Sequence, residues 1–178
     1  MAKYLWLIRH GKSRWDQPNL ADRQRALAPR GQAAASLMAR HYAAEFAQLQ
    51  LVHHSPAARC EQTLQYWLAQ RQVNLDSALE LDLKVLSQEA LYSFNWADLL
   101  LHIQGLSEAH SKVALVGHNP ALLELVEYLT GQDLVKFPTA SIAVLSTAKA
   151  WSAVGQHDAQ LALFDSPKRL AARLNCSL

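Results

Sequence analysis

The sequence has few cysteines and no long apolar stretch. Of its 178 residues only Cys60 and Cys176 are cysteines, and the longest apolar run is the five residues from Tyr4 to Ile8. Two cysteines are too few for a disulfide framework or a cysteine-rich zinc site. A run of five residues is far shorter than a membrane span or the apolar core of a signal peptide. We therefore expect a cytoplasmic protein without a membrane partner.

Glycine and proline are also scarce, at six residues each, and no repeat or linker-like stretch is visible. Apolar residues make up 51% of the chain and charged residues 18%. This balance is typical of a compact protein with a buried core and argues against a disordered chain. We expect residues 1–178 to form one domain, because this length suits a single core.

Charge is nearly balanced overall, at +2, but it is unevenly distributed. Residues 9–30 contain six basic residues and two acidic ones. This excess favours an anionic ligand, and a solvated basic face is the alternative. Nucleic acid is disfavoured as a partner, because the excess is small and no basic strand with interleaved aromatic residues accompanies it.

Apolar patterning predicts strands and helices that alternate along the chain. Strands are expected at 3–9, 49–54, 78–82, 112–116, 141–146 and 160–164, and helices at 29–48, from 56, at 96–105, at 120–131 and over the last dozen residues. We expect an irregular segment to follow the third strand as far as residue 93. The pattern predicts a three-layer α/β/α sandwich around a mostly parallel sheet of about five or six strands.

Three of the turns that follow strands carry cationic and imidazole side chains. Arg9 and His10 follow the first strand, Arg59 lies one turn beyond the second, and His118 follows the fourth. Taken singly, each histidine could be structural and each arginine a surface ion-pair partner. In a parallel sheet, however, ligands bind beyond the carboxyl ends of the strands, so these four side chains would converge at one edge.

Other phosphate and metal chemistries do not fit the sequence. The first glycine of a P-loop that ends at Lys12 would fall on Trp6, and the arginine of a thiol phosphatase with Cys60 as nucleophile would fall on Tyr66. No G-x-G-x-x-G, D-x-D, H-E-x-x-H or G-x-S-x-G motif occurs. The pair His53 and His54 lacks a third residue at ligand spacing, so we interpret it as a polar strand end.

Three segments together carry a family resemblance. The segments 7–13 (LIRHGKS), 55–63 (SPAARCEQT) and 116–120 (VGHNP) resemble, in the same order, the three signature blocks of the histidine phosphatase superfamily, the phosphoglycerate mutase-like proteins. Segment 22–31, with Ala-Leu-Tyr at 90–92, resembles the short branch that includes bacterial protein-phosphohistidine phosphatases. The resemblance implies a phosphoglycerate mutase-like fold.

The resemblance also implies roles for individual side chains. His10 would be the nucleophile that carries the phosphoryl group as covalent phosphohistidine. Arg9, Arg59 and His118 would bind the phosphate oxygens, and Arg25 would add a further contact. We expect no metal and no other cofactor, because these cationic side chains supply the positive field.

Two positions depart from the family pattern. Asp16 stands where mutase-like relatives often have asparagine, and we expect this carboxylate to point away from bound phosphate. Glu89 lies three residues before Tyr92, a spacing that resembles the catalytic acid of the mutases. The short branch often lacks this acid, so Glu89 is either the general acid or a surface glutamate.

The function predicted is metal-independent removal of phosphate from phosphohistidine in a protein, because only about 11 residues separate the predicted third strand from the next helix. So short a segment leaves no room for a lid, and an open site suits a phosphorylated protein. The alternatives are a phosphatase for small phosphomonoesters and a non-catalytic phosphate-binding domain. The oligomeric state and any redox role of Cys60 stay open.

Overall fold

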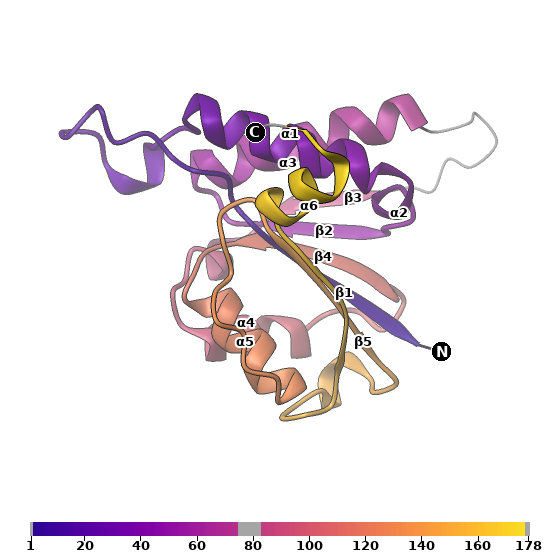
Figure 1. The fold of residues 1–178 in the computed structure, drawn as a ribbon. Helices are drawn as coiled ribbons and strands as arrows, with labels where there is room; N and C mark the ends of the chain where they lie inside the picture. The colour runs from indigo at the N-terminus through magenta and orange to yellow at the C-terminus, as the bar shows by residue number, and fades with distance from the viewer. Residues whose placement is uncertain (1, 75–82, 177–178) are drawn as a thin grey trace.

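The computed structural model describes residues 2–74 and 83–176, and a six-stranded sheet runs through its centre (Figure 1). The strand order is β3-β2-β4-β1-β5-β6. The strands are β1 (Lys3–Arg9), β2 (Leu51–His54), β3 (Lys84–Ser87), β4 (Lys112–Gly117), β5 (Ile142–Thr147) and β6 (Gln160–Asp165). Strands β1 to β4 are mutually parallel, and β5 is antiparallel to both β1 and β6. The predicted α/β class and mostly parallel sheet are confirmed.

Helices cover both faces of the sheet (Figure 1). One face carries α1 (Pro29–His41), α2 (Ala43–Phe46), α3 (Ala58–Asn74) and α6 (Pro167–Leu174), and the other carries α4 (Trp96–Gln104) and α5 (Ala121–Thr130). Side chains alternate across β1, so that Trp6 and Ile8 pack beneath the first group while Leu5 and Leu7 pack beneath the second. The two resulting cores make the three predicted layers. Within the described ranges, no helix combines the length and apolar character that crossing a membrane requires.

Capping residues mark the ends of several helices in the outer layers. Gly131 ends α5 in the left-handed region, with φ of 70°. Asn95 caps α4 by accepting a hydrogen bond from the backbone of Ala97, and Ser166 caps α6 in the same way. Three 3₁₀ turns lie in the connections, η1 (Asp22–Gln24), η2 (Glu89–Leu91) and η3 (Trp151–Ala153).

The helix predicted over residues 29–48 is divided into two. Tyr42 leaves the helical conformation, with φ of −105° and ψ of 21°, and separates α1 from α2. Its hydroxyl donates a 2.6 Å hydrogen bond to the buried carboxylate of Asp165. Met38, Tyr42, Phe46 and Leu49, which recur at helical spacing in the sequence, are nevertheless all buried. The predicted apolar face is therefore confirmed, and the prediction of one unbroken helix is wrong.

The third strand differs most from the expectation. The range 78–82 predicted for it lies outside the described residues, and β3 is found at 84–87, inside the segment expected to be irregular. All four residues of β3 are exposed, so the strand has no buried stripe by which to recognise it. It exists because its backbone pairs with β2 at the edge of the sheet. The segment between β3 and α4 is therefore even shorter than predicted.

The turn after β1 rests directly on the first turn of α1. A Cβ atom at Gly31 would lie 2.2 Å from the carbonyl oxygen of Lys12, a contact that backbone atoms cannot accommodate. The amide of Ala28 donates to the same oxygen at 2.8 Å. The position of the segment that follows Arg9 therefore depends on the absence of a side chain at residue 31.

We expect Gly31→Ala to destabilise the protein by about 1–3 kcal/mol, the usual cost of overpacking. The measurement is the free energy of unfolding in denaturant. Gly105→Ala is the control, because its Cβ would lie 3.5 Å from the nearest atom, an ordinary contact. Equal stability of the two variants would show that α1 and the turn can separate at no cost.

Candidate active site

A polar cavity lies at the carboxyl edge of the sheet, where the predicted side chains meet. Arg9 and His10 follow β1, His118 follows β4, and Arg59 lies in the first turn of α3. The cavity has a volume of about 510 Å³, and Arg9, His10 and Arg59 are among its lining residues. The rings of His10 and His118 have their centroids 5.0 Å apart. The convergence expected from a parallel sheet has therefore occurred.

His10 is held as a neutral imidazole in one tautomer. Its Nδ1 lies 2.7 Å from the carbonyl oxygen of Gly11, which only accepts, so Nδ1 carries the proton. Its Nε2 accepts from Nε of Arg59 at 3.3 Å. Burial lowers the pKa of His10 to about 4, and the charges of Arg59 and Arg9 also lower it, against the opposing effect of the Gly11 hydrogen bond. An unprotonated Nε2 at neutral pH can attack phosphorus.

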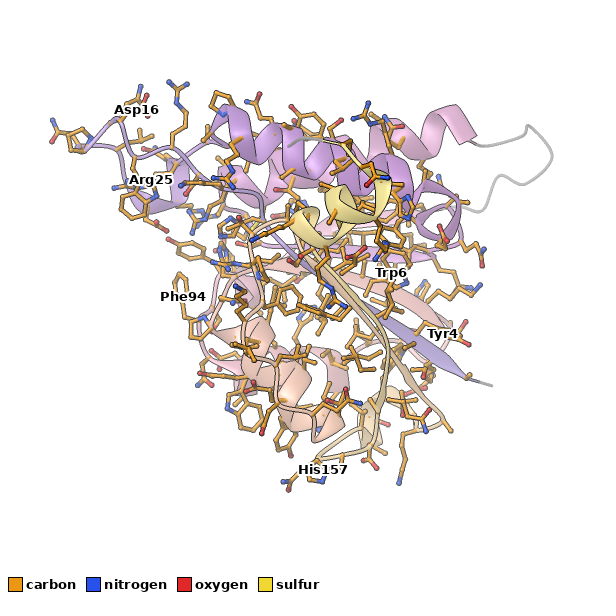
Figure 2. The ribbon with its side chains drawn as sticks, viewed as in Figure 1. Tyr4, Trp6, Asp16, Arg25, Phe94 and His157 are labelled. Atoms are coloured by element: carbon orange, nitrogen blue, oxygen red, sulfur yellow. The ribbon has the colours of Figure 1, made fainter. Side chains whose placement is uncertain are left out.

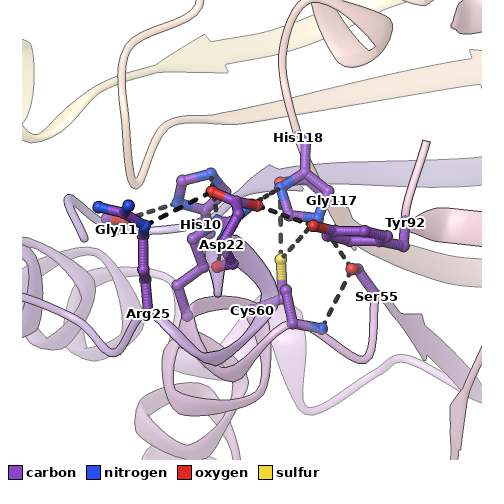
Figure 3. Close-up of polar contacts among 11 residues, drawn as sticks. His10, Gly11, Asp22, Arg25, Ser55, Cys60, Tyr92, Gly117 and His118 are labelled. Carbon is purple, nitrogen blue, oxygen red and sulfur yellow. Dashed lines mark hydrogen bonds and ion pairs between the residues drawn. The ribbon is translucent and has the colours of Figure 1, made fainter. Parts of the chain in front are cut away.

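His118 is also neutral and has the opposite tautomer. Its Nδ1 lies 3.3 Å from Nη2 of Arg59, which only donates, and its Nε2 lies 2.8 Å from Oγ of Ser55 (Figure 3). Nδ1 is therefore the acceptor and Nε2 carries the proton. Burial lowers the pKa of His118 to about 3, and His10 and Arg59 add to the effect. The rings of Tyr92 and Phe94 lie against it, with centroids 5.5 and 5.4 Å away.

Arg59 connects both histidines to Asp22. The Arg59 side chain is only 4% exposed, and it donates through Nη1 to the carbonyl of Asp22 at 2.6 Å and through Nη2 to Oδ2 at 2.9 Å. Tyr92 donates its hydroxyl to the same Oδ2 at 2.8 Å (Figure 3). Burial works to raise the pKa of Asp22, but the hydrogen bonds from Tyr92 and Arg59 outweigh it and hold the pKa below its usual value. Asp22 is therefore ionised at neutral pH.

Asp22 and Tyr92 were quoted in the family resemblance, but the sequence assigned neither of them a place in the site. Asp22 is in η1, between the strand predicted at 3–9 and the helix predicted at 29–48, and Tyr92 follows η2. Neither residue occurs at a spacing that would signal contact with Arg59. The only available signal was their position in segments that resemble the short branch.

Arg9 has a hydrogen-bond donor to spare. Its Nη1 donates to the carbonyl of Phe137 at 2.5 Å, while its buried Nε has no partner among the described residues. Burial lowers the pKa of Arg9 below its usual value. Buried donors are almost always satisfied in folded proteins, so an unpaired guanidinium N–H beside a cavity is suited to an anionic ligand.

Arg25 lies between Trp15 and Asp22 and is not among the residues that line the cavity. Its guanidinium carbon is 4.1 Å from the centre of the Trp15 ring, and its Nε is 4.0 Å from Oδ1 of Asp22. Trp15 itself is 69% exposed and lines the cavity. Figure 3 shows Arg25 and His118 on opposite sides of Asp22. The contact between Arg25 and phosphate stays a prediction.

Two carboxylates discussed from the sequence are held by neighbouring arginines. Glu89 accepts from both Nη atoms of Arg23, at 2.6 and 3.1 Å, and its side chain is 72% exposed. Asp16 pairs with Arg14 at 2.7 Å, near the tip of the loop between β1 and α1 (Figure 2). The expectation that Asp16 points away from the phosphate site is supported by this pairing. Glu89 is not among the residues that line the cavity.

Cys60 packs beneath the site as a buried thiol. It is 0% exposed, and its Sγ lies 3.6 Å from Nε2 of His118. Burial raises the pKa of the Cys60 thiol to about 12, so the reactive thiolate is not formed at neutral pH. Across residues 2–74 and 83–176, no three ligating side chains gather in a way that could hold a metal ion.

We expect NMR titration to show that His10 and His118 stay neutral until the pH falls below 5, because burial holds both pKa values near 3 to 4. The resonances can be assigned with His10→Gln and His118→Gln. The unfolded chain binds these protons near pH 6.5, so the free energy of unfolding should fall as the pH drops from about 6.5 to about 4. Titration of either ring near pH 6.5 in the folded protein would show that burial does not lower its pKa.

Comparison with known proteins agrees with this geometry. Residues 5–84 match the family model of the histidine phosphatase superfamily (branch 1). An uncharacterised protein of Mycobacterium leprae is 28% identical over 173 residues, which cover 90% of this chain and 100% of that protein.

Solved structures show the same relationship. The Agrobacterium tumefaciens protein assigned as the phosphohistidine phosphatase SixA superimposes with a TM-score of 0.75 at 29% identity, covering 93% of this chain and 98% of that one. The protein histidine phosphatase SixA in complex with tungstate gives a TM-score of 0.73 at 25% identity, covering 94% and 99%. The sequence match over residues 5–84, the shared fold and the paired histidines at the sheet edge lead to one conclusion: this chain is a phosphatase that is similar to the histidine phosphatase superfamily.

Proposed function

We propose that this phosphatase removes phosphate from phosphohistidine side chains of proteins. One observation carries the proposal. Asp22, the carboxylate that lines the cavity, accepts hydrogen bonds from Arg59 and Tyr92 and is ionised. It is therefore unsuited to donate a proton to a leaving group, and Glu89 is engaged by Arg23 outside the cavity.

The chemistry of the leaving group makes this observation informative. Breaking an alkyl phosphate expels a basic alkoxide, and a positioned acid typically accelerates that step 10²- to 10⁴-fold. A phosphorylated imidazole that is protonated on its distal nitrogen leaves as a neutral molecule and needs no such acid. The site is thus better matched to a phosphoramidate than to an alkyl ester.

The reaction proceeds in two transfers. Nε2 of His10 attacks phosphorus, and the bond between phosphorus and the substrate's imidazole nitrogen breaks with its electron pair leaving on that nitrogen. Water then attacks the phosphoryl group on His10. The bond from phosphorus to Nε2 breaks, its electron pair returns to His10, the water gives up a proton to solvent and inorganic phosphate leaves.

Three cationic or convertible donors stabilise the charge on the transferred oxygens. We infer that the unpaired Nε of Arg9 and the guanidinium of Arg59 donate to them. His118 can donate through Nδ1 only after it gains a proton there. A bound dianion favours that protonation, because opposite charge raises an imidazole pKa.

The mouth of the cavity suits a protein-bound histidine. The exposed aromatic rings of Trp15 and Phe94 line the cavity, and only residues 88–95 connect β3 to α4. Such rings can pack against an imidazole leaving group. The similarity to the SixA proteins, whose names refer to phosphohistidine or histidine phosphatases, supports the same substrate.

We expect His10→Ala to abolish turnover, because no other group forms the covalent bond, and Arg59→Ala to lose about 10²- to 10³-fold in kcat. Rapid quench of the wild-type protein with labelled substrate, in excess EDTA, should trap an acid-labile, base-stable phosphoenzyme. His54→Ala is the matched control, because His54 makes the same local contact as His10. Its Nδ1 lies 2.9 Å from the carbonyl oxygen of the next residue, Ser55. Label trapped on a serine or cysteine would refute the assignment.

We expect a phosphohistidine peptide to be hydrolysed with a kcat/KM about 10²-fold or more above that of the same peptide carrying phosphoserine, because only the alkyl ester needs an acid. Steady-state kinetics on the matched pair measures this ratio. Glu89→Gln should leave the phosphohistidine rate unchanged. A preference for phosphoserine or sugar phosphates would instead identify a phosphatase for small phosphomonoesters, and a large loss in Glu89→Gln would make Glu89 the acid.

A further inference from the structure

A second, smaller cavity adjoins the one that contains His10. Its volume is about 250 Å³, and it lies where the turn after β1 meets the first turns of α1 and α6. Lys12 and Thr139 line both cavities. The two cavities are therefore neighbours, and a chain bound at His10 lies close to the second one.

The second cavity is strongly basic. Lys12, Arg30 and Lys168 line it, and its lining contains no carboxylate. None of the three cations forms an ion pair with an acidic residue in the described part of the chain, whereas Arg14, Arg23 and Arg59 are each paired in this way. Three like charges that share one cavity repel each other, and an external anion would relieve that repulsion.

The three cations come from distant parts of the sequence. Lys12 follows β1, Arg30 is the second residue of α1, and Lys168 is the second residue of α6. Only the packing of α1 and α6 on the same face of the sheet brings them to one cavity. We call the surface formed by Lys12, Arg30 and Lys168 the basic groove.

We propose that the basic groove binds aspartate and glutamate side chains that flank the phosphohistidine in the substrate protein, an inference that rests on the proposed function. Arg30 and Lys168 are exposed, and an exposed ion pair is worth at most about 1 kcal/mol, too little to retain a free ion. The same ion pair contributes to affinity when the anion belongs to a chain already bound at His10, because the second contact is then intramolecular.

The test uses three substrates: a phosphohistidine peptide with acidic flanking residues, the same peptide with glutamine in their place, and a small aryl phosphate. The variant is Arg30→Gln combined with Lys168→Gln, because both side chains lie outside the cavity that contains His10. Arg40→Gln is the matched control, an exposed arginine at the other end of α1. Melting temperatures verify that every variant is folded.

We expect wild-type protein to favour the acidic peptide over the glutamine peptide by about 3- to 10-fold in kcat/KM, mainly through KM. The double variant should lose that preference and keep its rate on the aryl phosphate and the glutamine peptide, while Arg40→Gln should behave as wild type. Raising the ionic strength to about 1 M should remove the wild-type preference as well, since exposed charges are then screened within about 3 Å.

Three outcomes would refute either the basic groove or the proposed function, and the three substrates distinguish these outcomes. Equal turnover of the two peptides by wild type would refute the basic groove alone. A preference that survives in the double variant would place the recognition of acidic residues elsewhere on the protein. Turnover of the aryl phosphate with none of either peptide would refute the proposed function, and the inference with it.

Discussion

Arg59 carries a positive charge into an interior where its side chain is 4% exposed, and the arrangement of the site follows from how that charge is accommodated. Its donors face one nitrogen of His10, one nitrogen of His118 and two oxygens of Asp22. Each contact restricts its partner: both histidines must present lone pairs to the guanidinium, and Asp22 must stay ionised. A buried arginine without these partners would incur a large desolvation cost.

The same arrangement keeps the proposed nucleophile ready to react. Burial makes an imidazole resist protonation, and a nearby fixed cation adds to that resistance, so the pKa of His10 is about 4. The carbonyl of Gly11 then selects the tautomer that leaves Nε2 unprotonated. Attack on phosphorus therefore requires no base to remove a proton from the nucleophile. A proton donor would be needed only for the leaving group. The basicity of the leaving group therefore determines which substrates suit the site.

The scaffold supports this site by close backbone contact as well as by apolar packing. Side chains alternate along β1 into two cores, which fixes the direction in which Arg9 and His10 leave the strand. Gly31 lets α1 approach the carbonyl of Lys12, so the segment after β1 cannot shift without separating from the helix. The same approach places Lys12 beside Arg30 at the basic groove. The cavity that contains His10 and the basic groove thus share one structural support.

The sequence by itself determined the features that depend on local pattern. Apolar runs located β1 and β4, Gly105 and Gly131 marked the ends of α4 and α5, and the strand-end motifs identified Arg9, His10, Arg59 and His118 as a group. Parallel pairing then made their convergence a geometric consequence. Local pattern was sufficient here because these residues adjoin strong, buried elements whose position in a sheet is predictable.

Only the tertiary structure decided the features that depend on distant partners. The break at Tyr42 comes with a hydrogen bond to Asp165, and β3 forms an exposed edge through backbone pairing with β2. Asp22 reaches Arg59, and Glu89 reaches Arg23, across 37 and 66 residues of sequence. Ion pairs and edge pairing leave no periodic trace in a sequence, because the energy comes from a partner whose distance along the chain is arbitrary.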